Sequence, residues 1–151
     1  MLQRRSAREA ALKAVYAVEV GKNSTADVIQ RMLKPDLKDH AELYSFSEKL
    51  FLLTVDHAST HDELIQKHIK NWDVNRLAII DRLILRLAIT EFLYFEHIPT
   101  KVTINEAIEL AKDYSTRKSG NFVNGILDAV LSTLNDEHRI NKKGRGLIGS
   151  S

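Results

Sequence analysis

The sequence contains no cysteine. Disulfide bonds and thiolate metal sites are therefore excluded, and a reducing compartment is the simplest setting. The N-terminus, MLQRRSAREAAL, carries arginines that no uncharged apolar run follows, so no secretory signal peptide is predicted. The chain also lacks an uncharged apolar stretch of 18 residues, which argues against a membrane span. We expect a cytoplasmic protein with no membrane partner.

Catalytic signatures are missing as well. The sequence has no GxxxxGK[ST] loop, no GxGxxG after a strand, no GxSxG and no HExxH. His57 and His61 are four residues apart beside Asp56 and Asp62, but two imidazoles without a third ligand are a weak metal signal. We therefore expect neither an enzyme nor a bound metal or cofactor.

The charge of the chain is uneven although its total is only +2. Residues 1–13 carry +3 and residues 138–151 carry +4, which leaves −5 for the part between them. Basic ends on an acidic body favour a polyanion as the partner of the ends and a basic protein as the partner of the body. Charged termini that only keep a helical bundle soluble are the alternative.

Helical periodicity dominates the pattern, and no segment is typical of a strand. Helices are expected over about 6–20, 25–33, 40–58 and 60–69, with two more after Pro99. Ser24 or Thr25 is predicted to cap the second helix and Pro35 to end it. Capping boxes are predicted at Asp39/Glu42, Thr60/Glu63 and Thr103/Glu106. The fold class is all-α.

The stretch from Asp73 to Phe95 is apolar around most of a helix circumference. Such a helix is a buried one, so we expect a long central helix surrounded by other helices. At about 1.5 Å per residue it spans roughly 34 Å if unbroken. Arg82 and Arg86 are four residues apart, on a strip where this helix is expected to reach the surface.

Residues 116–122, TRKSGNF, precede the last predicted helix and form a candidate loop for binding single-stranded nucleic acid. Helix N-terminal N–H groups, two adjacent cations and an aromatic ring together suit single-stranded nucleic acid, with phosphates on the cations and a base on Phe122. Phe122 also heads the apolar stripe of that helix, so a core position is the alternative. Gly125, in mid-helix, predicts close packing against another backbone.

Four segments, in this order, resemble the bacterial NusB family of transcription antitermination factors. They are RRSAREAALKAVYAVEV, RLAIIDRLILRLAITEF, IPTKVTINEAIELAKDYS and GNFVNGILDAVL, and they cover roughly residues 4 to 131. The INEAIELAK and FVNGILD segments are the most specific. The resemblance implies a NusB-like fold of two small packed helical bundles around the central helix. It also implies binding of single-stranded boxA RNA together with NusE, the ribosomal small-subunit protein, so that RNA polymerase reads through terminators in ribosomal RNA operons.

The resemblance assigns residues to both partners. RNA binding falls to Arg4, Arg5, Arg8, Lys118, Asn121 and Phe122, and contact with NusE falls to Asp81, with Arg82 and Arg86 nearby. RNA polymerase is an indirect partner. Many family members have Lys or Arg where this chain has Asn121, and Lys118 replaces that cation in our interpretation.

Residues 1–135 are predicted to form a single NusB-like domain, and residues 136–151, with three glycines and no periodicity, a basic mobile tail. The same fold begins some ribosomal RNA cytosine methyltransferases, but we do not expect that activity here, because 151 residues leave no room for their catalytic domain. A helical protein–protein scaffold without direct RNA binding is the alternative function.

Overall fold

Helices make up the regular structure of this computed structural model, which describes residues 3–149. No strand occurs among these residues, so the all-α prediction is confirmed. The chain divides into two compact units, residues 1–57 and residues 58–151. Within the described range, no helix is both long and apolar enough to cross a membrane.

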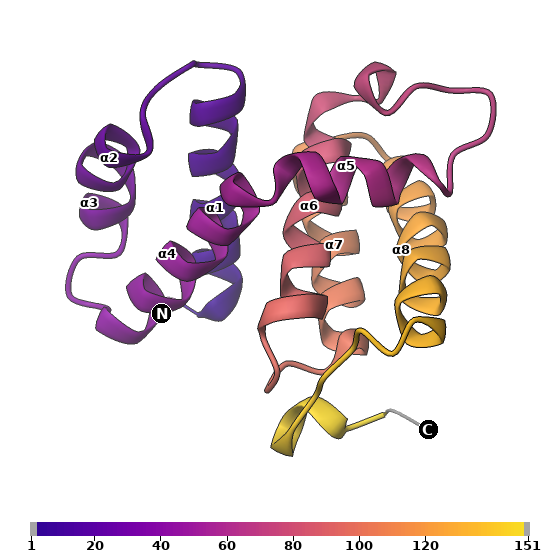
Figure 1. Ribbon diagram of the computed structural model, residues 1–151. Coiled ribbons are helices and arrows are strands. Elements are labelled where there is room, and N and C mark those ends of the chain that lie inside the picture. The colour runs from indigo at the N-terminus through magenta and orange to yellow at the C-terminus, as the bar shows by residue number, and fades with distance from the viewer. Residues whose placement is uncertain (1–2, 150–151) are drawn as a thin grey trace. The chain divides into compact units, whose positions relative to one another are not determined.

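The N-terminal unit contains α1 (Arg4–Glu19), α2 (Thr25–Val28), α3 (Lys34–Asp36) and α4 (Ala41–Asp56) (Figure 1). Helix α1 packs against α4 through a face of small residues. The alanines of this face are buried: Ala7, Ala10, Ala11 and Ala14. The helices approach so closely that Ser47 Oγ donates a 2.8 Å hydrogen bond to the backbone oxygen of Ala7.

Ser24 caps α2, as predicted, by accepting a 3.1 Å hydrogen bond from Asp27 N. The prediction that Pro35 ends this helix is wrong. The chain continues through a π-helical turn, Ile29–Leu33, into α3, which contains Pro35. The N–H of Lys34 reaches back five residues to Ile29 O. This wider turn accommodates a proline, which has no N–H to donate and whose ring crowds the preceding turn of a regular α-helix.

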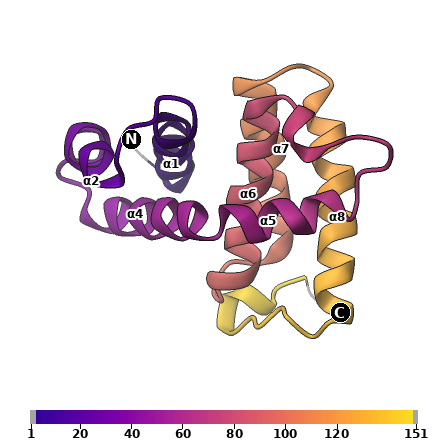
Figure 2. The same cartoon turned by 45° about the horizontal axis from the view of Figure 1, so that its top comes forward.

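The C-terminal unit contains α5 (Ala58–Gln66), α6 (Ile79–Tyr94), α7 (Thr100–Tyr114) and α8 (Ser119–Asp136). Helices α6, α7 and α8 pack against one another in pairs, and α5 lies against α6 and α8 (Figures 1 and 2). Every residue of α6 from Leu83 to Phe92 is buried, which confirms a buried central helix.

The three predicted capping boxes are wrong, because α4, α5 and α7 begin at Ala41, Ala58 and Thr100 instead. Thr103 is buried inside α7, where its hydroxyl donates a 3.0 Å hydrogen bond to Glu91 Oε1 of α6. Thr103 therefore has the residue type and spacing of a helix cap, but its hydroxyl contributes to the packing of α7 against α6.

Helix α6 is shorter than predicted because residues 73–78 do not join it. Asp73 accepts a 2.8 Å hydrogen bond from Asn75 N and starts a separate 3₁₀ turn, Val74–Arg76. Leu77 and Ala78 are then extended. At 16 residues the helix is about 24 Å long.

Residues 139–149 make defined contacts where a mobile tail is predicted. Lys142 Nζ donates hydrogen bonds to Glu91 O (3.0 Å) and Phe95 O (2.8 Å), at the C-terminal end of α6. Lys143 N donates to Glu96 O over 2.9 Å. A cation suits these last carbonyls, which lack partners within their own helix. The sequence does not indicate this contact, because a single half-buried lysine produces no periodic pattern.

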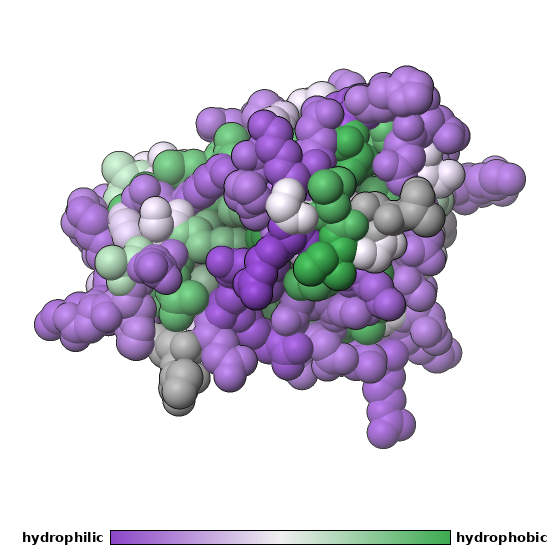
Figure 3. Space-filling view, turned by 90° about the horizontal axis from the view of Figure 1, so that it is seen from below, coloured by the Kyte–Doolittle hydropathy of each residue, from purple (hydrophilic) through white to green (hydrophobic). Residues whose placement is uncertain are grey.

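A 3₁₀ turn, Gly144–Leu147, follows these contacts. A β-carbon at Gly146 would collide with Glu96 O, so glycine is required for this approach. Leu147 and Ile148 remain exposed, and Figure 3, which views the chain from below, shows apolar surface on the side that carries this segment.

Candidate nucleic-acid interface

Two arginines at the start of α1 share one aromatic ring. The guanidinium carbon of Arg4 lies 4.9 Å from the centroid of Phe46 of α4, and that of Arg8 lies 5.2 Å from it. Each pairing is a cation–π contact, worth about 0.5–2 kcal/mol depending on solvent exposure. The ring therefore holds two like charges together, one helical turn apart.

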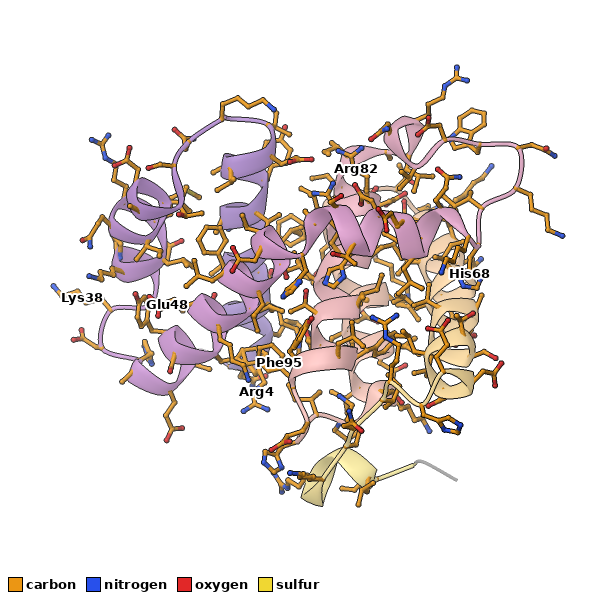
Figure 4. The ribbon with its side chains drawn as sticks, in the orientation of Figure 1. Arg4, Lys38, Glu48, His68, Arg82 and Phe95 are labelled. Carbon is orange, nitrogen blue, oxygen red and sulfur yellow. The ribbon has the colours of Figure 1, made fainter. Side chains whose placement is uncertain are left out.

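The exposure of these arginines differs from what their sequence suggests. Arg4 and Arg5 are exposed at the N-terminal end of α1, and Figure 4 marks Arg4 there. Arg8, however, is only 3% exposed. Arg8, which the resemblance assigns to RNA binding, is therefore not freely exposed, because it packs along Phe46. Sequence periodicity identifies Phe46 only as an apolar residue and does not indicate that it organises the arginines.

The positive end of the α1 helix dipole coincides with this arginine cluster, defined as Arg4, Arg5 and Arg8. The first turn of α1 contains no acidic residue to neutralise it. A helix N-terminus carries about half a positive charge and presents backbone N–H groups. An anion at this position would relieve the repulsion among the guanidinium groups, so the cluster suits phosphates.

The start of α8 is held in place by a hydroxyl network around Ser119. Ser119 Oγ donates a 3.0 Å hydrogen bond to Asp81 Oδ2 of α6 and accepts one of 3.3 Å from Thr116 N. The hydroxyl oxygens of Ser115 and Thr116 each lie 3.0 Å from it. Ser119 is 4% exposed. It positions the predicted RNA-binding loop, although the sequence marks it only as a small polar residue at a helix start.

The predicted binding residues of this loop lie on the surface beside that network. Lys118 is the residue before α8, and both Lys118 and Asn121 are exposed. Phe122 is half-buried, so it is neither a fully exposed ring for a base nor a full core residue. Asn121 and Phe122 follow Lys118 by three and four residues, so both lie on the same face as Lys118 at the start of the helix.

Close packing at α8 involves a different glycine from the one predicted. A β-carbon at Gly120 would lie 3.4 Å from Ile108 of α7, so Gly120 marks a tight helix approach. A β-carbon at Gly125 would meet nothing within 4 Å. The prediction for Gly125 is wrong, because this residue is exposed and no neighbouring backbone packs against it.

The expected surface strip of α6 is largely internal. Arg86 is 4% exposed and forms two hydrogen bonds with Asp62 of α5, at 2.8 and 2.6 Å. Asp81 is 8% exposed and is held by Ser119. The expectation that α6 reaches the surface at Arg86 is therefore wrong, because Asp62 of α5 covers and pairs with it. Asp81, which the resemblance assigns to NusE contact, is also buried. Arg82 is half-buried, and Figure 4 marks it near the beginning of α6.

The histidine pair of the sequence does not converge on a metal site. His61 is buried, and its Nε2 lies 3.0 Å from the Thr90 hydroxyl. Among residues 3–149, no three His, Cys, Asp or Glu side chains are grouped to hold an ion.

A sequence model of the NusB family matches residues 5–132. The chain belongs to the NusB family. The transcription antitermination protein NusB of Salinibacter ruber is 46% identical to it over 149 residues, which cover 99% of this chain and 93% of that relative. This is a family of transcription antitermination factors and not of enzymes.

Solved NusB structures have the same fold. NusB from T. maritima is 34% identical, with a TM-score of 0.78 over 87% of this chain and 92% of that one. A crystal structure of the antitermination factors NusB and NusE in complex with double-stranded RNA matches at 25% identity and a TM-score of 0.78. That match covers 86% of this chain and 96% of that one. The NusB-like fold is thereby confirmed.

Proposed function

We propose that this NusB family member binds boxA RNA together with NusE and so promotes read-through by RNA polymerase in ribosomal RNA operons. The observation that carries the proposal is the arginine cluster at the N-terminus of α1, where Phe46 holds Arg4 and Arg8 together. Membership in an antitermination family and the likeness to a NusB–NusE–RNA complex support it.

The proposed RNA site has two parts. In the N-terminal unit, Arg4 and Arg5 bind phosphates, and Arg8 adds charge from its place against Phe46. In the C-terminal unit, Lys118 binds a phosphate, Asn121 offers an amide, and the exposed part of Phe122 offers a ring to a base. Phosphate contacts give affinity and register, whereas unstacked bases suit aromatic and amide side chains.

A salt titration with single-stranded boxA-like RNA tests the proposal. If roughly four phosphates are neutralised, log K falls against log salt with a slope of about −3, at about −0.7 per contact for single strands. A slope near zero, or no binding at all, would contradict RNA binding and favour the helical scaffold.

The proposed contact with NusE rests on the start of α6. Of the three residues assigned to NusE contact, Arg82 is the most exposed. Asp81 is bonded to Ser119 of α8, and Arg86 is bonded to Asp62 of α5. We expect Arg82→Glu to weaken NusE binding in titration calorimetry without loss of RNA binding by the isolated chain. Unchanged NusE affinity would place the partner on another face.

A further inference from the structure

The only tryptophan of the chain lies on the surface. Trp72, in the segment between α5 and α6, is 49% exposed. In Figures 1 and 2 this segment forms a loop at the outer edge of the C-terminal unit. A half-exposed indole leaves a large apolar surface in contact with water, and neither helix packing nor the arginine cluster explains it.

The loop around Trp72 is fixed by specific hydrogen bonds. Gln66 Nε2 donates to Trp72 O, and Gln66 Oε1 accepts from Val74 N, both over 2.8 Å. One amide of α5 therefore clamps the backbone on both sides of Asp73. Asp73 in turn caps the following 3₁₀ turn. A ring presented from a fixed backbone loses less conformational entropy on binding than one on a mobile loop.

The segment that carries Trp72 is positively charged. The guanidinium carbon of Arg76 lies 5.0 Å from the centroid of the Trp72 ring. Lys67 and Lys70 are exposed in the same segment, and residues 67–76 carry a net charge of +2 with histidine neutral. Asp73 is the single acidic residue of this segment, and its carboxylate already serves as the cap. We call Lys67, Lys70, Trp72 and Arg76 the Trp72 surface.

Consecutive residues at the start of α6 link the Trp72 surface to the start of α8. Arg82 Nη1 donates a 3.2 Å hydrogen bond to Asn75 Oδ1 in the Trp72 loop. Its neighbour Asp81 accepts from Ser119, next to Lys118. The Trp72 loop and the start of α8 are therefore both hydrogen-bonded to the first turn of α6, within one compact unit.

We propose that the Trp72 surface is an additional contact for single-stranded RNA. An unpaired base stacks on the Trp72–Arg76 pair, while Lys67 and Lys70 bind phosphates. A planar ring next to cations is the arrangement that binds single strands without regard to sequence, because each base has a face that can stack. Duplex RNA does not offer such a free face. The inference rests on the proposed function and extends its RNA site along the C-terminal unit.

Trp72 supplies its own probe, since no other tryptophan contributes to the emission of the chain. The full chain is titrated with a fluorescently labelled boxA-like RNA that carries an unstructured pyrimidine extension. Anisotropy of the label measures total binding, and tryptophan emission measures stacking. We expect quenching of Trp72 over the same concentration range as the rise in anisotropy.

Substitutions of Trp72 show whether quenching of its emission reflects contact with RNA or a conformational change elsewhere in the chain. Trp72→Ala is expected to weaken binding of the extended RNA about tenfold, as alanine substitution of a stacking residue does. Trp72→Phe keeps a ring and is expected to restore most of the affinity. Tyr94→Ala, which removes another exposed aromatic ring of the unit, is the matched control and is expected to bind as wild type.

Two failures are distinguishable. If anisotropy rises normally, and Trp72→Ala binds the extended RNA as wild type does, the Trp72 surface is not an RNA contact and the proposed function stands. If Trp72→Ala loses affinity for NusE alone, the surface contacts a protein instead, and the inference is again overturned. If the wild-type chain produces no rise in anisotropy, the proposed function fails and this inference fails with it.

Discussion

Ser119 at the start of α8 holds the carboxylate of Asp81 in the first turn of α6 through a 3.0 Å hydrogen bond. The other carboxylate oxygen, Oδ1, is buried and has no hydrogen-bond partner in the described part of the chain. A negative charge near a helix N-terminus is favoured by the helix dipole, which helps to explain why this carboxylate is tolerated below the surface. Its side-chain partner comes from Ser119.

Ser119→Ala is therefore expected to destabilise the C-terminal unit. Removing one partner of a buried polar group typically costs about 1–3 kcal/mol. Urea unfolding of the variant measures the loss, and Ser132→Ala, at an exposed serine of the same helix, is the control. Equal stability of the two variants would mean that Asp81 does not depend on this bond.

The arginine cluster predicts a difference between two neighbouring positions. Arg5→Ala removes an exposed cation, so we expect weaker RNA binding with stability unchanged within ~0.5 kcal/mol. Arg8→Ala also removes a buried side chain from Phe46, so we expect it to lower both RNA affinity and melting temperature. RNA titrations and thermal melts of both variants check this. An Arg8→Ala protein that melts as wild type does would contradict the structural role of this contact.

Local patterns in the sequence predict the helices but not their side-chain partners. The apolar stripe of α8 is a good example, since its buried positions follow helical spacing: Val123, Leu127, Val130 and Leu134. Asp62 and Arg86, by contrast, are 24 residues apart, and only the packing of α5 on α6 brings them together. Pairings of this kind depend on tertiary structure, which periodicity does not encode.

Helix starts are the least predictable part of the fold. Thr103 has the residue type and spacing of a cap, but its hydroxyl is used by Glu91. Asp73 also has a cap pattern, and it does cap, but it starts a 3₁₀ turn instead of α6. The arginine cluster is predicted as a set of residues, whereas its support by Phe46 requires the packing of α1 on α4.

The ion pair of Arg86 and Asp62 predicts a large loss on truncation. The Arg86 side chain is 5% exposed and that of Asp62 18%, and Nη2 lies 2.6 Å from Oδ2. We expect Arg86→Ala to cost about 3 kcal/mol, because it leaves a largely buried carboxylate without its cation. Arg139→Ala breaks the exposed pair with Glu137 and is expected to cost under ~1 kcal/mol in the same denaturant titration. Similar losses for both would contradict the distinction between buried and exposed pairs.

The contact of Lys142 with the end of α6 predicts a rise in stability at alkaline pH. Burial lowers the pKa of Lys142 from 10.5 to about 8, although the charge of Glu91 acts in the opposite direction. Between these two values the unfolded chain binds more protons at this position than the folded one. The free energy of unfolding therefore gains a contribution as the pH rises from about 8 to 10.5, and loses it as the pH falls back.

Lys142→Arg isolates this contribution, because arginine stays charged throughout the range. Urea unfolding at several pH values is expected to show wild type gaining stability relative to Lys142→Arg as the pH passes through that window, since only the lysine can release its proton. The comparison removes the effect of every other titrating group that the two proteins share. Parallel stability curves would mean that the amine of Lys142 is solvated in the folded chain and that residues 139–149 are not held by it.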